Sequence, residues 1–110
     1  MGQREAIPQG TLDMLILKCL LRGGQLHGFQ IADSIQQFSR DVLQVEEGSL
    51  YPALQRMLIQ GWIQGDWGKT EENRRARFYR ITVDGRKHLE KELERYARVT
   101  QAIARVIQPA

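Results

Sequence analysis

The segment most informative about the fold is Glu47-Gly48-Ser49-Leu50-Tyr51-Pro52-Ala53-Leu54-Gln55-Arg56. A predicted strand start follows it at Trp62-Ile63, and a basic run comes shortly after, Asn73-Arg74-Arg75-Ala76-Arg77-Phe78-Tyr79-Arg80. The chain therefore places a helix with a polar outer face just before a basic β-ribbon. This is the order of parts in a winged helix that binds DNA.

The first of these segments is expected to be a two-faced helix that begins near Gly48 or Ser49. Pro52 fits only in the first turn, where its missing N–H costs nothing. The apolar side chains within a sector of about 100°, the width of a core-facing stripe, are Leu50, Leu54, Met57 and Leu58. The side chains expected to reach phosphates and base edges are Ser49, Tyr51, Gln55 and Arg56. An ordinary amphipathic helix with a solvated face fits the same pattern.

Two strands with a basic connection follow this helix. The segment from Trp62 to Trp67 is expected to pair with Ala76 to Thr82, and the seven residues 68–74 connect them. Connections of this length in compact domains tend to be functional. The residues expected along a phosphate backbone are Lys69, Asn73, Arg74, Arg75 and Arg77. Glu71 and Glu72 at the tip would repel that backbone unless they turn away from it.

Composition and charge fit a single small domain. The chain has 110 residues, 42% of them hydrophobic, and a formal net charge of +3, enough for one modest core. Residues 69–87 hold seven basic and three acidic side chains, so the basic charge is local. Cys19 is expected to be a small buried hydrophobe, and the apolar run around it is too short for a membrane span. We expect a cytoplasmic protein.

The helices on either side of the winged part are also predicted. Residues 11–21 are apolar on nearly every face, which favours burial on all sides and a share in a subunit interface. A second helix starts near Gly28, with Ile31, Ala32 and Ile35 facing the core. His27 just before it is interpreted as a residue at a turn or helix start, because no spacing in the chain resembles a zinc site.

The last helix is expected from Val83 to Ile107, capped by Thr82, and it would reach roughly 37 Å. That length exceeds what one small domain can cover. The positions spaced four and three residues apart, as in the seam of a helix that packs along another helix, are Leu89, Leu93, Tyr96, Thr100, Ile103 and Ile107. Ala97 and Ala104 lie beside this seam and permit close approach. Packing against its own domain alone is the alternative.

The chain resembles the PadR family of bacterial winged-helix transcriptional regulators over almost its whole length. The segments that carry the resemblance are Gly10-Thr11-Leu12-Asp13, His27-Gly28-Phe29-Gln30-Ile31, Gly48-Ser49-Leu50-Tyr51-Pro52-Ala53-Leu54-Gln55-Arg56-Met57, Gly61-Trp62-Ile63, Arg74-Arg75-Ala76-Arg77-Phe78-Tyr79-Arg80-Ile81-Thr82 and Asp84-Gly85-Arg86. It is similar to the short subgroup with a single C-terminal dimerisation helix. It departs from the commonest pattern at Ser49, where Thr is usual, and at Trp62, where Leu is usual.

The resemblance implies a homodimeric repressor that binds double-stranded DNA at an inverted repeat. The helix with Tyr51 would enter the major groove, and the arginine-rich ribbon would form the wing. The last helix would pack against the partner's first and last helices. The dimer interface expected on this basis and from the seam comprises Leu12, Leu15, Leu89, Leu93, Tyr96, Ala97, Thr100, Ile103 and Ile107.

The expected fold is mainly α with a small β-hairpin, in the order helix, helix, helix, strand, strand, helix. Residues 1–82 would form the winged helix-turn-helix domain that binds DNA, and 83–110 the dimerisation helix, in one compact unit. No enzyme motif, cofactor site or metal site is expected. A small aromatic or drug-like effector bound around Tyr96 is one hypothesis, and a tyrosine that only packs is the other. A winged helix that serves only as a protein-interaction module is the alternative function.

Overall fold

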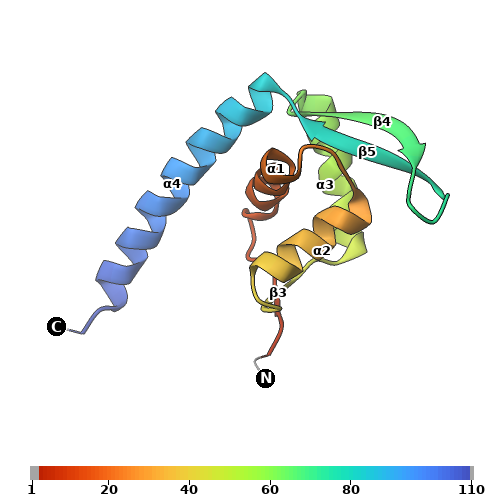
Figure 1. Cartoon of the computed structure of the whole chain (residues 1–110). Helices are drawn as coiled ribbons and strands as arrows, with labels where there is room; N and C mark the ends of the chain where they lie inside the picture. The colour runs from red at the N-terminus through yellow and green to blue at the C-terminus, as the bar shows by residue number, and fades with distance from the viewer. Residues whose placement is uncertain (1–2, 110) are drawn as a thin grey trace.

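The computed structural model describes residues 3–109 of the chain. Its elements in order are β1 (Glu5–Ala6), α1 (Leu12–Gly23), β2 (Leu26–His27), α2 (Gly28–Phe38), β3 (Leu43–Gln44), α3 (Glu47–Gln60), β4 (Ile63–Lys69), β5 (Arg75–Ile81) and α4 (Val83–Ile107). The first three helices gather together, the β4–β5 ribbon projects to one side and α4 extends to the other (Figure 1). The predicted order of long elements is confirmed. Met1, Gly2 and Ala110, which the predicted domain ranges include, lie outside the described residues.

The core lies between α1, α2, α3 and the sheet. Ile16, Leu17 and Leu20 of α1 are fully buried, whereas Leu12 and Leu15 are half-buried and Leu21 is exposed. One chain therefore does not bury α1 on all sides, because the C-terminal end of its outer face lies open. The predicted share of α1 in a subunit interface stays a prediction. Cys19 is buried as predicted, and that burial raises the pKa of its thiol. The thiol stays protonated at neutral pH and behaves as a hydrophobe.

The α3 helix buries the predicted stripe. Leu50, Leu54 and Met57 are buried, with Ala53 beside them, and Leu58 is half-buried. Gly61, with a left-handed φ of 79°, ends the helix, as only a residue without a Cβ does without strain.

The start of α3 differs from the prediction. The helix begins at Glu47, so Pro52 lies in the second turn rather than the first. Its missing N–H leaves the carbonyl of Gly48 without the usual helical donor. Both residues are exposed, so water can hydrogen-bond that carbonyl and the helix tolerates the proline.

The sheet is larger than the predicted hairpin. Both predicted strands are shifted: β4 runs to Lys69 and β5 starts at Arg75, which shortens the connection to residues 70–74. A third strand, β2, pairs with β5 through Leu26 opposite Tyr79. A separate parallel pair joins β1 to β3. Strands of two residues have no periodicity of their own, because pairing with a distant segment defines them, so no sequence pattern predicts them.

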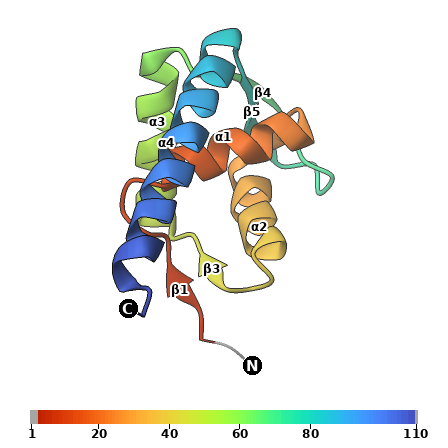
Figure 2. The same ribbon diagram turned by 90° about the vertical axis from the view of Figure 1, so that its left-hand side faces the viewer.

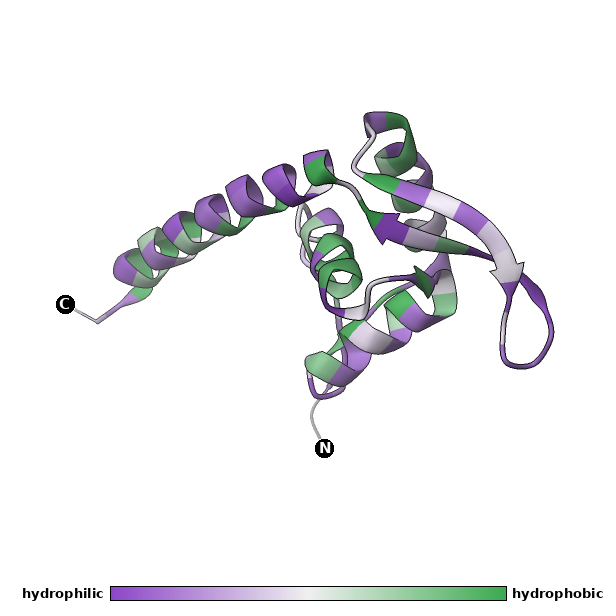
Figure 3. Cartoon of the chain, turned by 45° about the horizontal axis from the view of Figure 1, so that its top comes forward, coloured by the Kyte–Doolittle hydropathy of each residue, from purple (hydrophilic) through white to green (hydrophobic). Residues whose placement is uncertain are grey.

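The α4 helix begins and ends where the sequence predicts. The Thr82 hydroxyl accepts a hydrogen bond from the backbone N–H of Gly85 at 3.0 Å. Leu89 is only 2% exposed, whereas every residue from Leu93 to Gln108 is exposed. Figure 2 shows α4 crossing in front of α1, and Figure 3 shows hydrophobic residues along one side of it. In residues 3–109 no helix combines the length and apolar character that a bilayer crossing requires.

Candidate nucleic-acid interface

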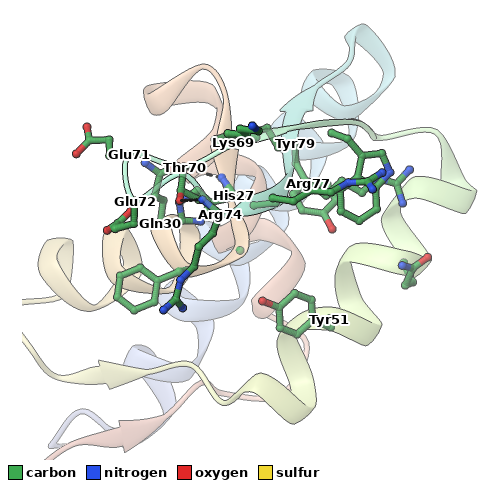
Figure 4. Close-up of a pocket in the computed structure, with 17 residues that line it drawn as sticks. His27, Gln30, Tyr51, Lys69, Thr70, Glu71, Glu72, Arg74, Arg77 and Tyr79 are labelled. Atoms are coloured by element: carbon green, nitrogen blue, oxygen red, sulfur yellow. Dashed lines mark hydrogen bonds between the residues drawn. The ribbon is translucent and has the colours of Figure 1, made fainter.

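A concave surface lies where three segments meet: the start of α2, the exposed side of α3 and the β4–β5 ribbon. The hollow that it encloses has a volume of about 1130 Å³. Figure 4 shows side chains from all three segments turned toward this hollow. The four cationic side chains that line it are Lys69, Arg74, Arg75 and Arg77, and the two anionic ones are Glu71 and Glu72. The surface therefore carries a net positive charge suited to a polyanion.

The start of α2 forms one side of the hollow. The backbone N–H of His27 donates a hydrogen bond to Oε1 of Gln30 at 3.0 Å, which fixes the first turn of the helix. His27 is thus the helix-start residue that the sequence predicts. Phe29 lies next to it and is 73% exposed. The free N–H groups of a helix N-terminus add positive potential at this side of the hollow.

Tyr51 of α3 packs closely against the start of α2. A Cβ added at Gly28 would lie 3.0 Å from the Tyr51 hydroxyl oxygen, so glycine allows the phenol ring to approach the α2 backbone. Tyr51 is half-exposed. The ring is therefore supported on one side and open to the hollow on the other.

Tyr79 and Arg77 of β5 line the floor of the hollow together with Tyr51 of α3. Burial raises the pKa of the Tyr79 hydroxyl, the Arg77 guanidinium opposes that shift, and Tyr51 adds to it. The Tyr79 hydroxyl therefore stays protonated at neutral pH and can donate a hydrogen bond.

Arg77 is anchored against the ribbon. A Cβ at Gly65 would lie 2.5 Å from Arg77 Nε, so the side chain crosses β4 where there is no Cβ. That nitrogen is buried, and within residues 3–109 it has no hydrogen-bond partner. A buried unsatisfied donor costs free energy, about 1–3 kcal/mol.

The outer part of the ribbon presents the other cations. The Arg75 guanidinium carbon lies 4.5 Å from the centre of the Trp67 ring, a cation–π contact that holds this side chain along the ribbon. The turn closes with a hydrogen bond from the Thr70 N–H to the Arg74 carbonyl at 2.8 Å. Asn73 occupies the left-handed position of this turn, with φ 63°, which Asn tolerates better than most residues.

The structure gathers most but not all of the residues predicted to contact DNA. Those that line the hollow are Tyr51, Gln55, Lys69, Arg74, Arg75 and Arg77. Ser49 is exposed in the first turn of α3, and Asn73 lies in the turn; neither lines the hollow. Arg56 lies outside it as well, and its guanidinium forms an ion pair with Asp13 of α1. The Arg56 side chain is still about half-exposed.

Several residues of the hollow were not singled out from the sequence as site residues, namely His27, Gly28, Phe29, Gln30 and Trp67. Phe29 and Trp67 are large apolar side chains left exposed, and a sequence does not tell which apolar residues stay outside. His27 and Gln30 had the features of a helix start. The pairing of β2 with β5 brings the start of that helix next to the ribbon.

The residues predicted for a dimer interface fall into two groups. Leu89 is buried within its own chain, and Leu12 and Leu15 are half-buried. Tyr96 is 50% exposed and Ile103 54% exposed. The exposed members along the outer part of α4 are Leu93, Tyr96, Ala97, Thr100, Ile103 and Ile107. A shallow groove of about 390 Å³ separates this face, at Tyr96, from the chain around Thr11.

Comparisons with known proteins agree with this geometry. A transcriptional regulator from Clostridium thermocellum superposes with a TM-score of 0.83 at 26% identity, covering 91% of this chain and 96% of that one. A PadR-like transcriptional regulator from Bacillus cereus shares the fold, with a TM-score of 0.76 at 24% identity over 93% and 96% of the two chains. Uncharacterized protein X of Lysinibacillus sphaericus is 28% identical over 100 residues, which is 91% of each chain. Residues 16–91 match the transcriptional regulator PadR-like family, and the chain belongs to this family.

Proposed function

We propose that this protein is a repressor that binds an inverted-repeat operator as a homodimer. Residues 1–82 would be the DNA-reading unit and residues 83–110 the dimerisation helix. The observation that carries the proposal is the concave surface, where the exposed half of α3 adjoins four cationic ribbon side chains. Membership of a family of transcriptional regulators supports DNA as the partner.

The two parts of the surface have different tasks in this proposal. Tyr51 and Gln55 lie on the half of α3 that a major groove can admit, and they would contact base edges, together with the exposed Ser49. Lys69, Arg74 and Arg75 on the ribbon would neutralise phosphates and supply affinity that does not depend on sequence. Arg56 would have to leave Asp13 to take part, so its contribution to affinity is smaller than that of a free arginine.

The dimer rests on α4. Its outer half exposes an apolar seam through Leu93, Tyr96 and Ile103, and a second copy of the same helix would cover that seam. A two-fold dimer would place two α3 helices on one side of the assembly, about one turn of DNA apart or a small multiple of it. The operator would then be an inverted repeat.

Footprinting of the protein on the DNA upstream of its own gene tests the proposal directly. The expected result is one protected inverted repeat, with binding that weakens steeply as salt is raised. The same repeat is then placed in the promoter of a reporter gene. If the protein is a repressor, loss of its binding to that promoter should raise expression of the reporter. Absence of any protected site would favour a winged helix that binds only proteins.

Charge removal on the wing tests the contact surface. Arg74→Ala with Arg75→Ala should weaken binding and reduce the slope of log K against log salt by about 2. The matched control is Lys91→Ala with Arg98→Ala, which removes two exposed charges from the side of α4 opposite the seam. An unchanged slope in the wing variant would refute the role of the ribbon.

An effector site is the last part of the proposal. The groove beside Tyr96 would be closed by the partner copy, and a planar aromatic ligand would stack on the two tyrosine rings. Titration with planar dyes, followed by tyrosine fluorescence, should show a response in the native protein that Tyr96→Ala loses. No response in either protein would count against a ligand here and leave Tyr96 as a packing residue.

A further inference from the structure

The end of α3 and the base of α4 are joined by a short hydrogen-bonded junction. The Thr82 hydroxyl donates to the carbonyl of Gly61 at 2.7 Å, and the Thr82 N–H donates to the carbonyl of Trp62 at 3.0 Å. Gly61 is the residue that ends α3. The residue just before α4 is therefore hydrogen-bonded to the two residues that follow the helix proposed to read DNA.

The first turn of α4 also presses on this junction. A Cβ at Gly85 would lie 2.1 Å from the carbonyl oxygen of Trp62, so the two backbones approach as closely as glycine allows. These contacts all lie within the first turn of α4. They fix where the helix starts, but contacts at one point leave the rest of a helix free to tilt.

One turn further along, two aromatic rings stack across the junction. The rings of Trp62 and His88 have their centres 3.6 Å apart and an interplanar angle of 12°. Nε2 of His88 lies 3.7 Å from Oε1 of Glu92, and Oε2 of Glu92 lies 3.5 Å from Nη1 of Arg95 on the same helix. The His88 side chain is 25% exposed. The ring is therefore held between the Trp62 ring and its own helix.

The stack and the core hold α4 from two directions. Leu89 is buried in the core, and His88 is its neighbour, about 100° around the helix. A helix held along one side can rock about that side, and a second contact on a different side removes this freedom. A tilt of about 5° at the base of a helix roughly 37 Å long would displace its far end by about 3 Å, close to the length of one base-pair step.

We propose that Trp62 and His88 are positioning residues, whose stack sets the angle between α4 and the reading surface and so the half-site spacing that the dimer accepts. The inference rests on the proposed function, because spacing has a meaning only for a dimer on an inverted repeat. Neither residue lines the concave surface. Their effect on DNA binding would act through the placement of α3, and would leave the contacts within each half-site unchanged.

The experiment measures binding to a set of duplexes in which the two half-sites of the footprinted operator are moved apart or together by one or two base pairs. The native protein should lose at least about tenfold in affinity for each changed spacing. Trp62→Leu and His88→Ala each remove one ring of the stack, and should reduce that loss to less than about threefold, because the two reading surfaces can then adjust. Thermal unfolding is measured for each variant.

Two further variants separate positioning from general damage. His88→Phe keeps a ring that can stack and should retain the spacing preference of the native protein. Lys91→Ala, at an exposed position one turn further along, should leave it unchanged. A native spacing preference in His88→Ala, or a loss of affinity in His88→Ala that is equal at all spacings, would overturn the inference. If the native protein binds no inverted repeat, the proposed function fails first, and that result is distinct from either of these.

Discussion

At the scale of single residues, the wing tip combines charges of opposite sign. Glu71 and Glu72 line the same hollow as Lys69 and Arg74. Figure 4 shows the two glutamates at the end of the ribbon nearest the start of α2. They would oppose an anionic partner, so under the proposed function they would limit binding to DNA of any sequence and leave specific contacts to α3. The two glutamates should therefore have a measurable effect on the affinity for non-operator DNA.

Glu71→Gln with Glu72→Gln should raise affinity for non-operator DNA about threefold to tenfold at low salt, because two charges that repel phosphates are removed. The gain should shrink as salt is raised, since exposed charges are screened. A filter or polarisation assay on a random duplex measures it. Glu90→Gln with Glu94→Gln on exposed positions of α4 is the matched control, and equal gains in both pairs would show a net-charge effect alone.

A second residue-scale effect concerns acid stability. A hydrogen bond from Gln36, and then one from Arg4, lowers the pKa of the Asp41 carboxyl. A lowered pKa in the folded state gives a stability contribution that is present above the unfolded pKa of about 3.9 and is lost as pH falls through the folded value. The contribution is thus expected at neutral pH and absent in strong acid.

Asp41→Asn should therefore lower the Tm relative to the native protein near neutral pH, and the difference should shrink as pH falls below about 4. Asn is chosen because Asp41 has a φ of 66°, and Asn tolerates this conformation. Thermal unfolding followed by circular dichroism across pH measures the effect. A Tm difference that is constant across pH would contradict it.

At the scale of elements, the long helices were predictable and their junctions were not. The bounds of α4 follow from a Thr82 cap and an apolar repeat, both local features of the sequence. The sequence pattern predicts a strand that starts at Trp62, but β4 begins one residue later and the Trp62 ring stacks on His88. Its partner lies 26 positions further along, beyond any helical or strand period, so no local pattern could predict the stack.

The close approach of Gly85 in α4 to the carbonyl of Trp62 is also the contact most easily disrupted by a substitution. Gly85→Ala should lower the free energy of unfolding by about 3 kcal/mol, because a Cβ there meets a backbone carbonyl that cannot move alone. Chemical denaturation measures this change. Lys87→Ala, at an exposed position in the next turn, should change it by less than about 0.5 kcal/mol. A loss below about 1 kcal/mol for Gly85→Ala would mean that α4 shifts without cost.

At the scale of the whole molecule, the outer half of α4 extends as an arm that the other described residues, 3–109, leave exposed. Its residues from Leu93 onward are exposed, and Figure 1 shows the helix leaving the other elements toward its C-terminal end. Apolar residues on such an arm favour association, since burial of each would contribute about 25 cal/mol per Å². The assembly state is therefore the property most sensitive to this seam.

Ile103→Glu should raise the dimer dissociation constant about 100-fold or more, because a carboxylate would have to be buried in an apolar seam. Sedimentation or light scattering across protein concentration measures it, and operator binding should fall in parallel. Gln101→Glu places the same charge on the opposite side of α4 and should leave the dimer intact. A dimer unaffected by Ile103→Glu would mean that the seam is not the interface.

The helices, the cap at Thr82 and the basic character of the ribbon could all be predicted from the amino-acid sequence, because periodicity, capping and charge act between near neighbours. The start of α2 beside the ribbon, the ion pair of Arg56 with Asp13 and the stack of Trp62 on His88 depend on the packed structure. Each of these joins residues distant in the sequence. Such contacts depend on how the elements pack, and packing is settled by the whole core rather than by any segment of it.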